Sequence, residues 1–514
     1  MSFKNPVISG AHPDPSICRV GDDYYLCNST FAYYPGAPIF HSKDLVNWRL
    51  IGHALKCPSQ LPLEGVAAQN GMYAPTLRHI NGRFYMITTL VHHPTMGSQH
   101  LYVWADNPAG EWSDPIWINQ RGIDPDLFQD DDGKVYFVRN NFGEGDPRGI
   151  VAAEIDLETG EMLSEMKFLW TGTGGYEPEG PHLYKFGEWY YLMLAENGTY
   201  YGHMETIGRS KDLWGPYESC PHNPILTHRD VTPHSIKCTG HADIIQDHQG
   251  DWWMIFLGVR PPNGWVDYQH LGRETFLTPI TWENGWPVVN QGKPVELEMD
   301  VPTLTLVPQP SVPERDDFDR DTLDSHWLTL RQPDKNCFSL TERPGYLRIK
   351  GNENSLDDEG SSPALLARWQ TEMNCRVKTC LEFSPANDNE EGGLATFMRE
   401  SHHYEIAVTQ RNQKRVVLLR RRIDDLQKVV AEHEIGEGPI TLICEATPVL
   451  FTFSYGVVDE KVRELGTGKI KPIGVEAAAV FTGMVFGLYA TGNGKDASQP
   501  ADFDYFDYEE QSKR

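Results

Sequence analysis

The stretch "GYEPEGPHLYKFGEWYYLMLAE" (175–196) begins with two acids, Glu177 and Glu179, each beside a proline, and ends in a strand-like run of aromatic and aliphatic residues. Proline restricts the backbone, so the two carboxyl groups are expected on a rigid turn at the start of a strand. The rest of the chain repeats this arrangement, and the repeat predicts the fold.

A glycine at a tight turn, followed by an aromatic-rich strand, occurs five times in the first half of the chain. The five glycines lie 51 to 63 residues apart, which is enough for a four-stranded unit with long loops; they are Gly21, Gly82, Gly133, Gly187 and Gly250. Long amphipathic helix patterns are lacking, so the chain is predicted to be all-β. Five such units predict a five-bladed β-propeller.

A short motif lies seven to nine residues before each glycine: "HPDPSI", "MYAPTL", "IDPDLF", "PEGPHL" and "GHADII". The leading chemical residues of the motifs are Asp14, Tyr73, Asp124, Glu179 and His241. If each motif opens the innermost strand of its blade, these five side chains converge at one end of the propeller axis. The spacing therefore predicts a site with three carboxylates, one phenol and one imidazole.

Three converging carboxyl groups are suited to cleaving a glycosidic bond, since one acid donates a proton to the leaving oxygen and another activates water or attacks the sugar. A third carboxylate can raise the pKa of the acid. Two neighbouring acids rank second: Asp126 points to the same face of the strand but lies deeper, and Glu177 precedes the repeat position.

Two further residues are candidates for the same site. His241 is read either as a buried core histidine or, on the axis beside three acids, as a group that holds a cation or orients a carboxylate. Arg273, in "HLGRETFL", is a candidate to bind a substrate hydroxyl or to pair with a carboxylate. Its simpler interpretation is a surface ion pair.

Composition excludes several classes of function. The net charge of −27 disfavours nucleic acid as a partner, because phosphate binding needs clustered Lys and Arg. The nine cysteines are scattered without a CxxC pair, which indicates a reducing compartment. The N-terminus has no apolar signal core and no run reaches 18 apolar residues, so we expect a cytoplasmic protein that does not enter membranes.

A proline-rich segment, "EMDVPTLTLVPQPSVPERDDFDR" (298–320), divides the chain. We expect the propeller over residues 1–302, a linker over 303–315 and a second all-β domain over 316–510. The length and the strand pattern of this second domain fit a β-sandwich.

The motifs "NPVISGAHPDPSICRVGDDYYLCNST" (5–30), "GIDPDLFQDDDGKVYF" (122–137), "PEGPHLYK" (178–185), "TGHADIIQD" (239–247) and "LGRETFL" (271–277) resemble those of glycoside hydrolase family 43, as do "FTGMVFGLYATG" (481–492) and "ADFDYFDYEE" (501–510). The resemblance is to β-xylosidases and α-L-arabinofuranosidases with a C-terminal β-sandwich of the concanavalin A-like jelly-roll type, and it covers nearly the whole chain.

The resemblance implies an exo-acting enzyme that cleaves with inversion and removes one terminal pentose from xylo- or arabino-oligosaccharides. It implies that Asp14 is the general base, that Asp124 tunes the pKa of the acid and orients it, and that Glu179 is the general acid. For an inverting enzyme, the carboxyl groups of base and acid are expected about 6.5–9.5 Å apart.

The resemblance also implies that the sugar pocket is lined by Phe31, His241, Arg273 and Phe481, with Phe481 reaching over from the sandwich. Tyr73 stands where many relatives have Trp, and this change touches the wall that distinguishes xylose from arabinofuranose. No cofactor is required, although a divalent cation such as calcium is a candidate near His241. Relatives are often dimers or tetramers, so a homo-oligomer is expected.

Three alternatives stay open on the sequence. A non-catalytic carbohydrate-binding propeller would use the acids only to hold sugar, and a scaffold propeller would not need them on the axis. An endo-acting arabinanase would need an open groove, which the additional sandwich with Phe481 disfavours.

Overall fold

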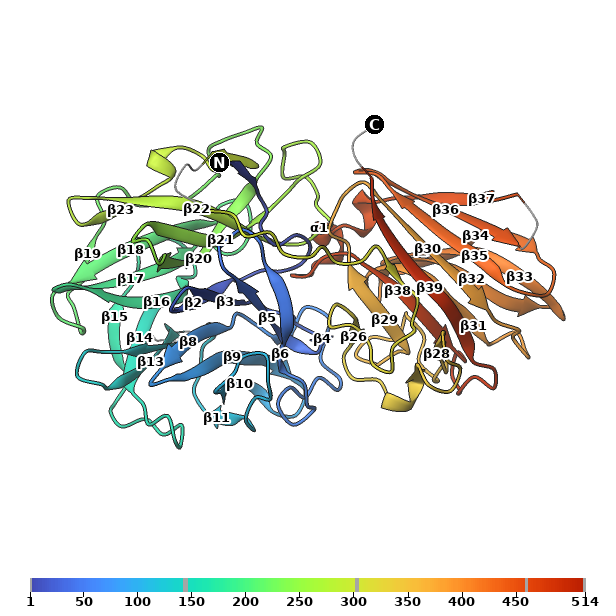
Figure 1. The fold of residues 1–514 in the computed structure, drawn as a ribbon, viewed down its shortest axis with the longest axis horizontal. Coiled ribbons are helices and arrows are strands. Elements are labelled where there is room, and N and C mark those ends of the chain that lie inside the picture. Colours follow the sequence, from blue (N-terminus) through green and yellow to red (C-terminus); the bar gives the residue numbers. More distant parts are fainter. Residues whose placement is uncertain (1, 142–146, 301–304, 458–460, 512–514) are drawn as a thin grey trace.

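The computed structural model describes residues 2–141, 147–300, 305–457 and 461–511. The molecule consists of a five-bladed β-propeller beside a two-sheet β-sandwich, which confirms the predicted all-β class and architecture (Figure 1). α1 (Val475–Ala478) is the only α-helix among the described residues. No helix in this part of the chain is both long and apolar enough to cross a membrane.

Each of the five predicted repeats forms one antiparallel blade whose first strand lies innermost. The repeat glycines lie in the turns between the first and second long strands of the blades, and all five have positive φ angles between 62° and 98°. Glycine adopts this left-handed conformation without steric cost, which explains its recurrence. The strands are, for blade 1, β2 (Ser16–Val20), β3 (Asp23–Cys27), β5 (Gly36–Ser42) and β6 (Arg49–Leu55); for blade 2, β7 (Gly71–Met72), β8 (Thr76–Ile80), β9 (Arg83–His93), β10 (Gly97–Ala105) and β11 (Ile116–Ile118); for blade 3, β12 (Asp126–Gln129), β13 (Val135–Asn141), β14 (Gly149–Glu154) and β15 (Lys167–Trp170); for blade 4, β16 (Glu179–Phe186), β17 (Trp189–Glu196), β18 (Met204–Ser210) and β19 (Glu218–Ser219); and for blade 5, β20 (Lys237–Gln246), β21 (Trp252–Val259), β22 (Glu274–Glu283) and β23 (Trp286–Val289).

The two ends of the propeller segment are joined by a short strand pair. β1 (Ser2–Lys4) pairs antiparallel with β24 (Glu298–Asp300), and a bridge connects Ile8 to Thr275 of blade 5. These pairings bring the first residues of the chain against the last blade and its exit. The predicted boundary at 302/303 lies outside the described residues.

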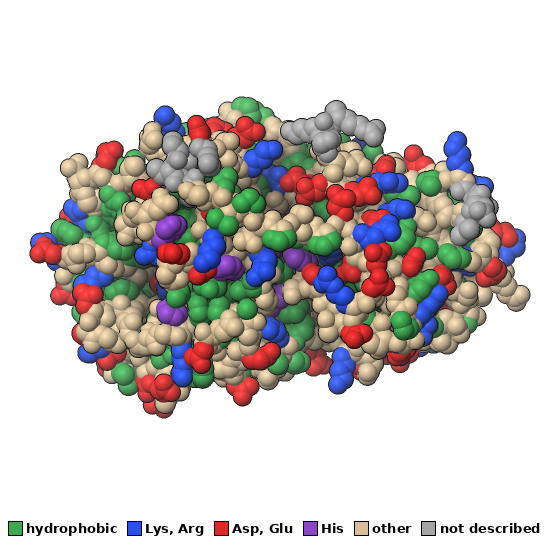
Figure 2. All heavy atoms as spheres, in the orientation of Figure 1, with side chains coloured by type: hydrophobic (Ala, Val, Ile, Leu, Met, Phe, Trp, Pro, Cys, Tyr) green, Lys and Arg blue, Asp and Glu red, His purple; other side chains and the backbone are tan. Residues whose placement is uncertain are grey.

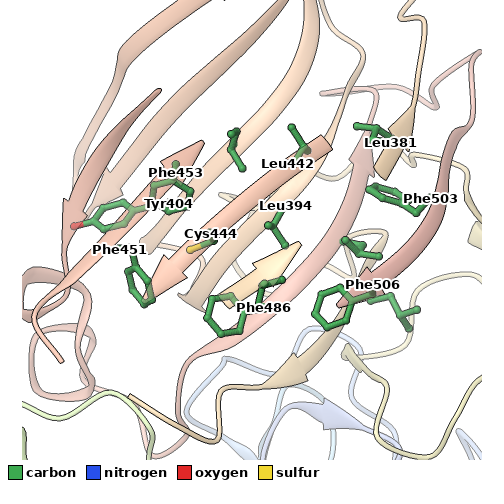
Figure 3. Close-up of a cluster of buried hydrophobic side chains, with 14 of the residues drawn as sticks. Leu381, Leu394, Tyr404, Leu442, Cys444, Phe451, Phe453, Phe486, Phe503 and Phe506 are labelled. Atoms are coloured by element: carbon green, nitrogen blue, oxygen red, sulfur yellow. The ribbon is translucent and has the colours of Figure 1, made fainter. Parts of the chain in front are cut away.

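The sandwich is built from two sheets of eight strands each. One sheet contains β25 (Arg315–Asp316), β27 (Phe338–Ser339), β28 (Leu347–Ile349), β30 (Cys375–Glu382), β35 (Ile440–Ala446), β36 (Leu450–Val457), β37 (Arg463–Lys469) and β39 (Ala501–Glu510); the other contains β4 (Tyr33–Tyr34), β26 (Leu328–Leu330), β29 (Leu365–Trp369), β31 (Glu391–Arg399), β32 (His402–Arg411), β33 (Lys414–Ile423), β34 (Leu426–Glu434) and β38 (Val485–Thr491). Between the sheets, aromatic side chains such as Phe451, Phe486 and Phe506 meet in a buried core (Figure 3). Burial of this apolar surface is the main stabilising contribution to the domain.

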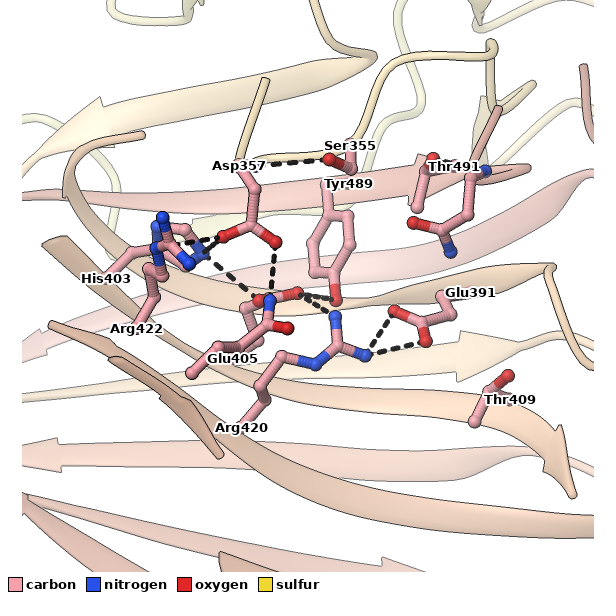
Figure 4. A network of polar contacts seen from close by, with 12 residues as sticks. Ser355, Asp357, Glu391, His403, Glu405, Thr409, Arg420, Arg422, Tyr489 and Thr491 are labelled. Carbon is pink, nitrogen blue, oxygen red and sulfur yellow. Dashed lines mark hydrogen bonds and ion pairs between the residues drawn. The ribbon is translucent and has the colours of Figure 1, made fainter. Parts of the chain in front are cut away.

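A buried polar network occupies the opposite face of the second sheet (Figure 4). Arg420 on β33 donates to both carboxylate oxygens of Glu391 on β31, at 2.6 and 2.7 Å. Glu405 on β32 accepts hydrogen bonds from the Tyr489 hydroxyl (2.5 Å) and pairs with His403 Nε2 (3.1 Å). Each acid in the network therefore has a cationic or hydrogen-bonding partner.

The two domains share one sheet, which the sequence did not indicate. β4 belongs to a propeller loop, yet it pairs antiparallel with β26 of the sandwich, and Figure 1 shows it between the two domains. The buried Arg331 reinforces the joint, because its side chain donates to Val66 O and to Glu400 at 2.5 Å each. Phe31, two residues before β4, is thus held by both domains.

The surface carries the acidity expected from composition. Figure 2 shows Asp and Glu side chains spread over this face of both domains, with Lys and Arg interspersed among them. Such a distribution is typical of a solvated, charged surface.

Candidate active site

A cavity of about 120 Å³ opens at the end of the propeller axis where the innermost strands begin. All eight residues that the sequence assigned to a site lie around this cavity. The lining residues are Asp14, Phe31, Tyr73, Ala74, Ile123, Asp124, Glu177, Glu179, Gly198, Thr199, Tyr200, His241, Arg273 and Phe481.

The repeat places chemically active residues at matching points of the backbone. Asp14 and Asp124 each lie two residues before the innermost strand of their blade, and Glu179 is the first residue of its strand. Asp14, Asp124 and His241 have φ angles of 53°, 54° and 49°. This left-handed conformation is uncommon for residues other than glycine, and it often occurs at functional sites.

Asp14 is a carboxylate held in its ionised form. Its Oδ1 accepts a hydrogen bond from Arg273 Nη1 at 2.7 Å and lies 3.9 Å from His241 Nδ1, while Ser29 donates its hydroxyl to Oδ2. Burial alone would raise the pKa of Asp14, but Arg273, His241 and Ser29 outweigh burial and hold the pKa below its ordinary value. A carboxylate in this state can accept a proton from water.

Glu179 and Asp124 lie in the opposite electrostatic situation. Burial and the nearby charges of Asp124 and Asp14 raise the pKa of Glu179 well above its ordinary value, and Glu177 adds to the effect. Burial and the charge of Asp14 raise the pKa of Asp124 to about 7, although the Gly180 N–H donates to its Oδ2 at 3.1 Å. Since these acids are close and share unfavourable charge, Glu179 keeps a proton near neutral pH.

His241 packs against the turn that carries Glu179. A Cβ atom at position 180 would lie 2.9 Å from His241 Nε2, so the close approach of the ring requires glycine there. Burial lowers the pKa of His241 to about 4, and the imidazole is neutral at physiological pH. It therefore lies beside Asp14 as a neutral ring, with its Nδ1 3.9 Å from Asp14 Oδ1.

The cation expected near His241 finds no ligand set among the described residues. In the parts of the chain that the structure describes, no group of three or more His, Cys, Asp or Glu has a geometry that could hold a metal ion. The negative charge of Asp14, the acid next to His241, is already paired with Arg273.

Three aromatic rings form one wall of the cavity. The ring centroids of Phe31 and Phe481 are 5.8 Å apart and nearly parallel, and Tyr73 lies 5.2 Å from Phe31 and 6.0 Å from Phe481. The Arg273 guanidinium lies 5.5 and 5.6 Å from the two phenylalanine rings. Phe481 follows α1 of the sandwich, so the second domain contributes a side chain to the wall of the pocket.

Some pocket residues were missed or ranked second. Ser29 and Thr199 each contact the Asp14–Arg273 pair, since Arg273 Nη1 also donates to Thr199 Oγ1 at 3.1 Å. Neither residue occupies a repeat position, so spacing carried no signal for them. Of the two acids ranked second, Glu177 lines the cavity, whereas Asp126 is bound to Arg78 at 3.0 Å.

Comparisons with known proteins agree with this geometry. Residues 3–287 match the model of glycosyl hydrolases family 43, and residues 315–509 match the beta xylosidase C-terminal concanavalin A-like domain. The chain is 43% identical to a non-reducing end alpha-L-arabinofuranosidase of Bacteroides ovatus, over 99% of this chain and 94% of that protein. It is 38% identical to a xylosidase/arabinosidase of Butyrivibrio fibrisolvens, over 98% of this chain and 99% of that protein.

Solved structures show the same similarity in three dimensions. One from Bacteroides ovatus, described as xyloglucan PUL GH43B, superimposes with a TM-score of 0.95 at 42% identity and covers 99% of this chain and 100% of that one. A xylan beta-1,4-xylosidase from Bacillus halodurans superimposes with a TM-score of 0.91 at 33% identity, covering 99% of this chain and 100% of that chain.

Proposed function

The chain belongs to glycosyl hydrolases family 43, and from this premise we propose that it is an exo-acting, inverting glycosidase that releases a terminal pentose, α-L-arabinofuranose or β-xylose, from oligosaccharides. One observation carries the proposal: the same pocket is lined by Asp14, which has a lowered pKa, and by Glu179, which has a raised pKa. Such a pair can supply a base and an acid at the same pH.

Asp14 acts as the general base in this mechanism. It takes a proton from a water molecule, and the oxygen of that water attacks the anomeric carbon of the terminal sugar. Arg273 keeps Asp14 ionised and in place through its 2.7 Å hydrogen bond. Asp14 needs no prior deprotonation at neutral pH.

Glu179 acts as the general acid on the other side of the sugar. It donates its proton to the glycosidic oxygen as the bond to the anomeric carbon breaks, and the remaining saccharide leaves as an alcohol. Asp124 stays close and keeps the pKa of Glu179 high, so the proton is available when the substrate binds. The product sugar carries the opposite anomeric configuration.

The closed end of the pocket supports an exo-acting enzyme. Phe31 of the propeller and Phe481 of the sandwich stack at 5.8 Å and form one wall of a cavity of about 120 Å³. A cavity of this size suits one sugar residue at a chain end better than the middle of a polymer.

The relatives bear on which pentose is preferred. The 43%-identical relative is an alpha-L-arabinofuranosidase, whereas the Butyrivibrio relative is named for both sugars. We therefore propose activity on both, with arabinofuranose preferred.

A paired assay tests the function. Wild type, Glu179→Ala and the control Glu188→Ala, which removes an exposed carboxylate of the same blade, are assayed on 4-nitrophenyl α-L-arabinofuranoside and β-D-xylopyranoside, and on a natural oligosaccharide. We expect turnover by wild type and the control, and a loss of about 10²–10⁴-fold in Glu179→Ala on the natural substrate. NMR of the fresh product reports the anomeric configuration. A retained configuration or an unimpaired Glu179→Ala would overturn the mechanism.

Two expectations from the sequence remain predictions. The chain is expected to form a homodimer or homotetramer, which light scattering would measure. It is expected to reside in the cytoplasm, which fractionation of the producing cells would test.

A further inference from the structure

Exposed aromatic side chains gather around the mouth of the pocket. The described part of the chain has five large aromatic residues among its exposed apolar side chains, and four of them lie on the loops at this end of the propeller. Tyr176, Tyr200, Tyr201 and Trp265 are 57%, 61%, 49% and 55% exposed. Exposed aromatic rings on one face are typical of a binding surface.

Three of the four rings belong to blade 4, the blade that carries Glu179. Tyr176 precedes the lining residue Glu177, and Tyr200 lines the cavity itself. The backbone joins the two loops, because the Asn197 N–H donates to Tyr176 O at 2.6 Å and the Tyr176 N–H donates to Asn197 Oδ1 at 2.9 Å.

Trp265 continues this surface onto blade 5. It lies on the loop between β21 and β22, which also carries Arg273 into the pocket. The neighbouring Gly264 accepts a hydrogen bond from the His234 N–H at 3.0 Å. His234 belongs to a loop over residues 231–234, in which Val231 O accepts a hydrogen bond from Lys237 Nζ at 2.5 Å. The same Nζ lies 5.1 Å from the Tyr201 ring centroid, so this loop links Trp265 to Tyr201.

Two of the rings are fixed in orientation. Arg148 lies over Tyr176 at 5.0 Å from the centroid, and Lys237 lies over Tyr201 at 5.1 Å. A cation against one face restrains a ring, while about half of each residue remains exposed. A restrained ring loses little conformational freedom when it binds a ligand.

The reaction geometry indicates what occupies this surface. Glu179 protonates the glycosidic oxygen, so the leaving part of the substrate starts beside Glu179 and continues out of the pocket. Blade 4 supplies both Glu179 and the loops that carry Tyr176, Tyr200 and Tyr201, and Tyr200 lines the cavity. Glu177, whose side chain lines the pocket, disfavours an anionic saccharide by charge repulsion.

We propose that Tyr176, Tyr200, Tyr201 and Trp265, the aromatic platform, bind the backbone of a long, neutral polysaccharide or oligosaccharide from which the terminal pentose is removed. This inference rests on the proposed function. The apolar C–H faces of successive sugars stack on the rings. The platform makes the enzyme one that trims side chains or ends of extended substrates.

The test compares substrates that share one terminal pentose and differ in length. 4-Nitrophenyl pentoside reports the pocket alone, and a series of oligosaccharides with a growing neutral backbone reports the platform. The variants are Tyr176→Ala, Tyr201→Ala and Trp265→Ala, with Tyr176→Phe and Tyr201→Phe as controls that keep the ring. Leu426→Ala, an exposed apolar residue of the sandwich, is the control for surface truncation.

We expect wild-type kcat/KM to rise with backbone length. Each alanine variant should lose roughly three- to tenfold on the longest substrates, mainly through KM, and stay within about twofold of wild type on the nitrophenyl pentoside. The phenylalanine variants and Leu426→Ala should behave like wild type. The platform would be overturned if the alanine variants matched wild type on long substrates, or if their kcat/KM fell equally on long substrates and on nitrophenyl pentoside. Either result would leave the proposed function standing. A wild type that cleaves no pentoside at all would remove the proposed function and the platform with it.

Discussion

Two layers of carboxylates lie one behind the other along the propeller axis, and they behave in opposite ways. The pocket layer contains Asp14, Asp124 and Glu179. The second layer contains Asp126 and Asp243, which lie two residues further along the chain than Asp124 and His241. Asp126 on β12 and Asp243 on β20 both contact Arg78, so the two acids of the second layer converge on one side chain.

The second layer is balanced by one arginine. Arg78 pairs with Asp126 at 3.0 Å and with Asp243 at 2.9 Å, and Tyr184 donates its hydroxyl to Asp243 at 2.6 Å. Burial would raise the pKa of both acids, but Arg78 and the neighbouring His182 keep the pKa values below the ordinary range.

The pocket layer has three acids and one nearby arginine, Arg273, which pairs with Asp14. The pKa values of Asp124 and Glu179 therefore rise. The sandwich network of Figure 4 resembles the second layer, since Arg420 and His403 outweigh burial and lower the pKa of Glu405 to about 2. For the three pocket acids and the two acids of the second layer, the pKa falls where an arginine is in direct contact and rises where none is.

Removing the proposed base of the pocket layer, Asp14, should have the largest effect on activity. Asp14→Asn is expected to lower kcat/KM about 10²–10⁴-fold, because the attacking water loses its proton acceptor. The loss should be similar for nitrophenyl and natural substrates, since the base does not act on the leaving group. Steady-state kinetics on both substrates measures it, with circular dichroism as the control for folding. An enzyme that retained most of its activity would show that Asp14 is not the base.

Removing Arg78, the cation of the second layer, should destabilise the folded protein. Arg78→Met leaves Asp126 and Asp243 buried without the arginine that balances their charges, so we expect a loss of about 3–5 kcal/mol in the free energy of unfolding. Denaturant titration measures it. Adding Asp126→Asn and Asp243→Asn to this variant should recover part of the loss, because both buried charges then disappear. A single variant as stable as wild type would contradict the assigned role of Arg78.

The pH dependence of kcat/KM tests whether Asp124 raises the pKa of Glu179. Asp124 raises the pKa of Glu179 by its negative charge, so Asp124→Asn should lower that pKa. The alkaline limb of kcat/KM is expected to move to lower pH by about 1–2 units, since Glu179 then loses its proton earlier. Glu188→Gln, which removes an exposed carboxylate of the same blade, should leave the limb in place. If the alkaline limb of Asp124→Asn stayed in place, Asp124 would not be the residue that raises the pKa of Glu179.

The smallest expected effect is a gain in stability. The pKa of Asp124 is about 7 in the folded protein and about 4 in the unfolded chain, so its charge costs stability as pH rises from 4 to 7. Asp124→Asn should therefore raise the free energy of unfolding above pH 7, by on the order of 1–2 kcal/mol, and leave it unchanged below pH 4. Thermal unfolding at pH 4 and pH 8 measures both arms. A variant less stable than wild type at pH 8 would show that Asp124 is bound favourably in its charged form.

The candidate site was predictable to the extent that it follows the repeat. Asp14, Tyr73, Asp124, Glu179 and His241 precede the repeat glycines at nearly constant distances, so their convergence could be expected. Phe31, Arg273 and Phe481 lie outside the repeat positions; Arg273 was a candidate from its local sequence, and the family resemblance pointed to Phe31 and Phe481. Ser29 and Thr199 had no such signal: Ser29 contacts Asp14 from the other end of the first hairpin of blade 1, and Thr199 of blade 4 contacts Arg273 of blade 5.

The domain joint was not predictable from local pattern. Tyr33 and Tyr34 form a strand of only two residues, and their partner Thr329 lies almost 300 positions away. Strand pairing over such a separation depends on where the completed domains place their edges, which no local periodicity encodes.

Short-range spacing repeated along the chain was enough to predict the all-β class, the five blades and the group of residues at the mouth of the axis. Which of the buried acids lie against a cation became visible only in the folded molecule. Asp124 and Asp126 stand two positions apart on the same blade, and Arg78, which comes from another blade, pairs with Asp126. The protonation state of a buried carboxylate depends on the charges within a few ångströms, and packing between distant segments decides which charges those are.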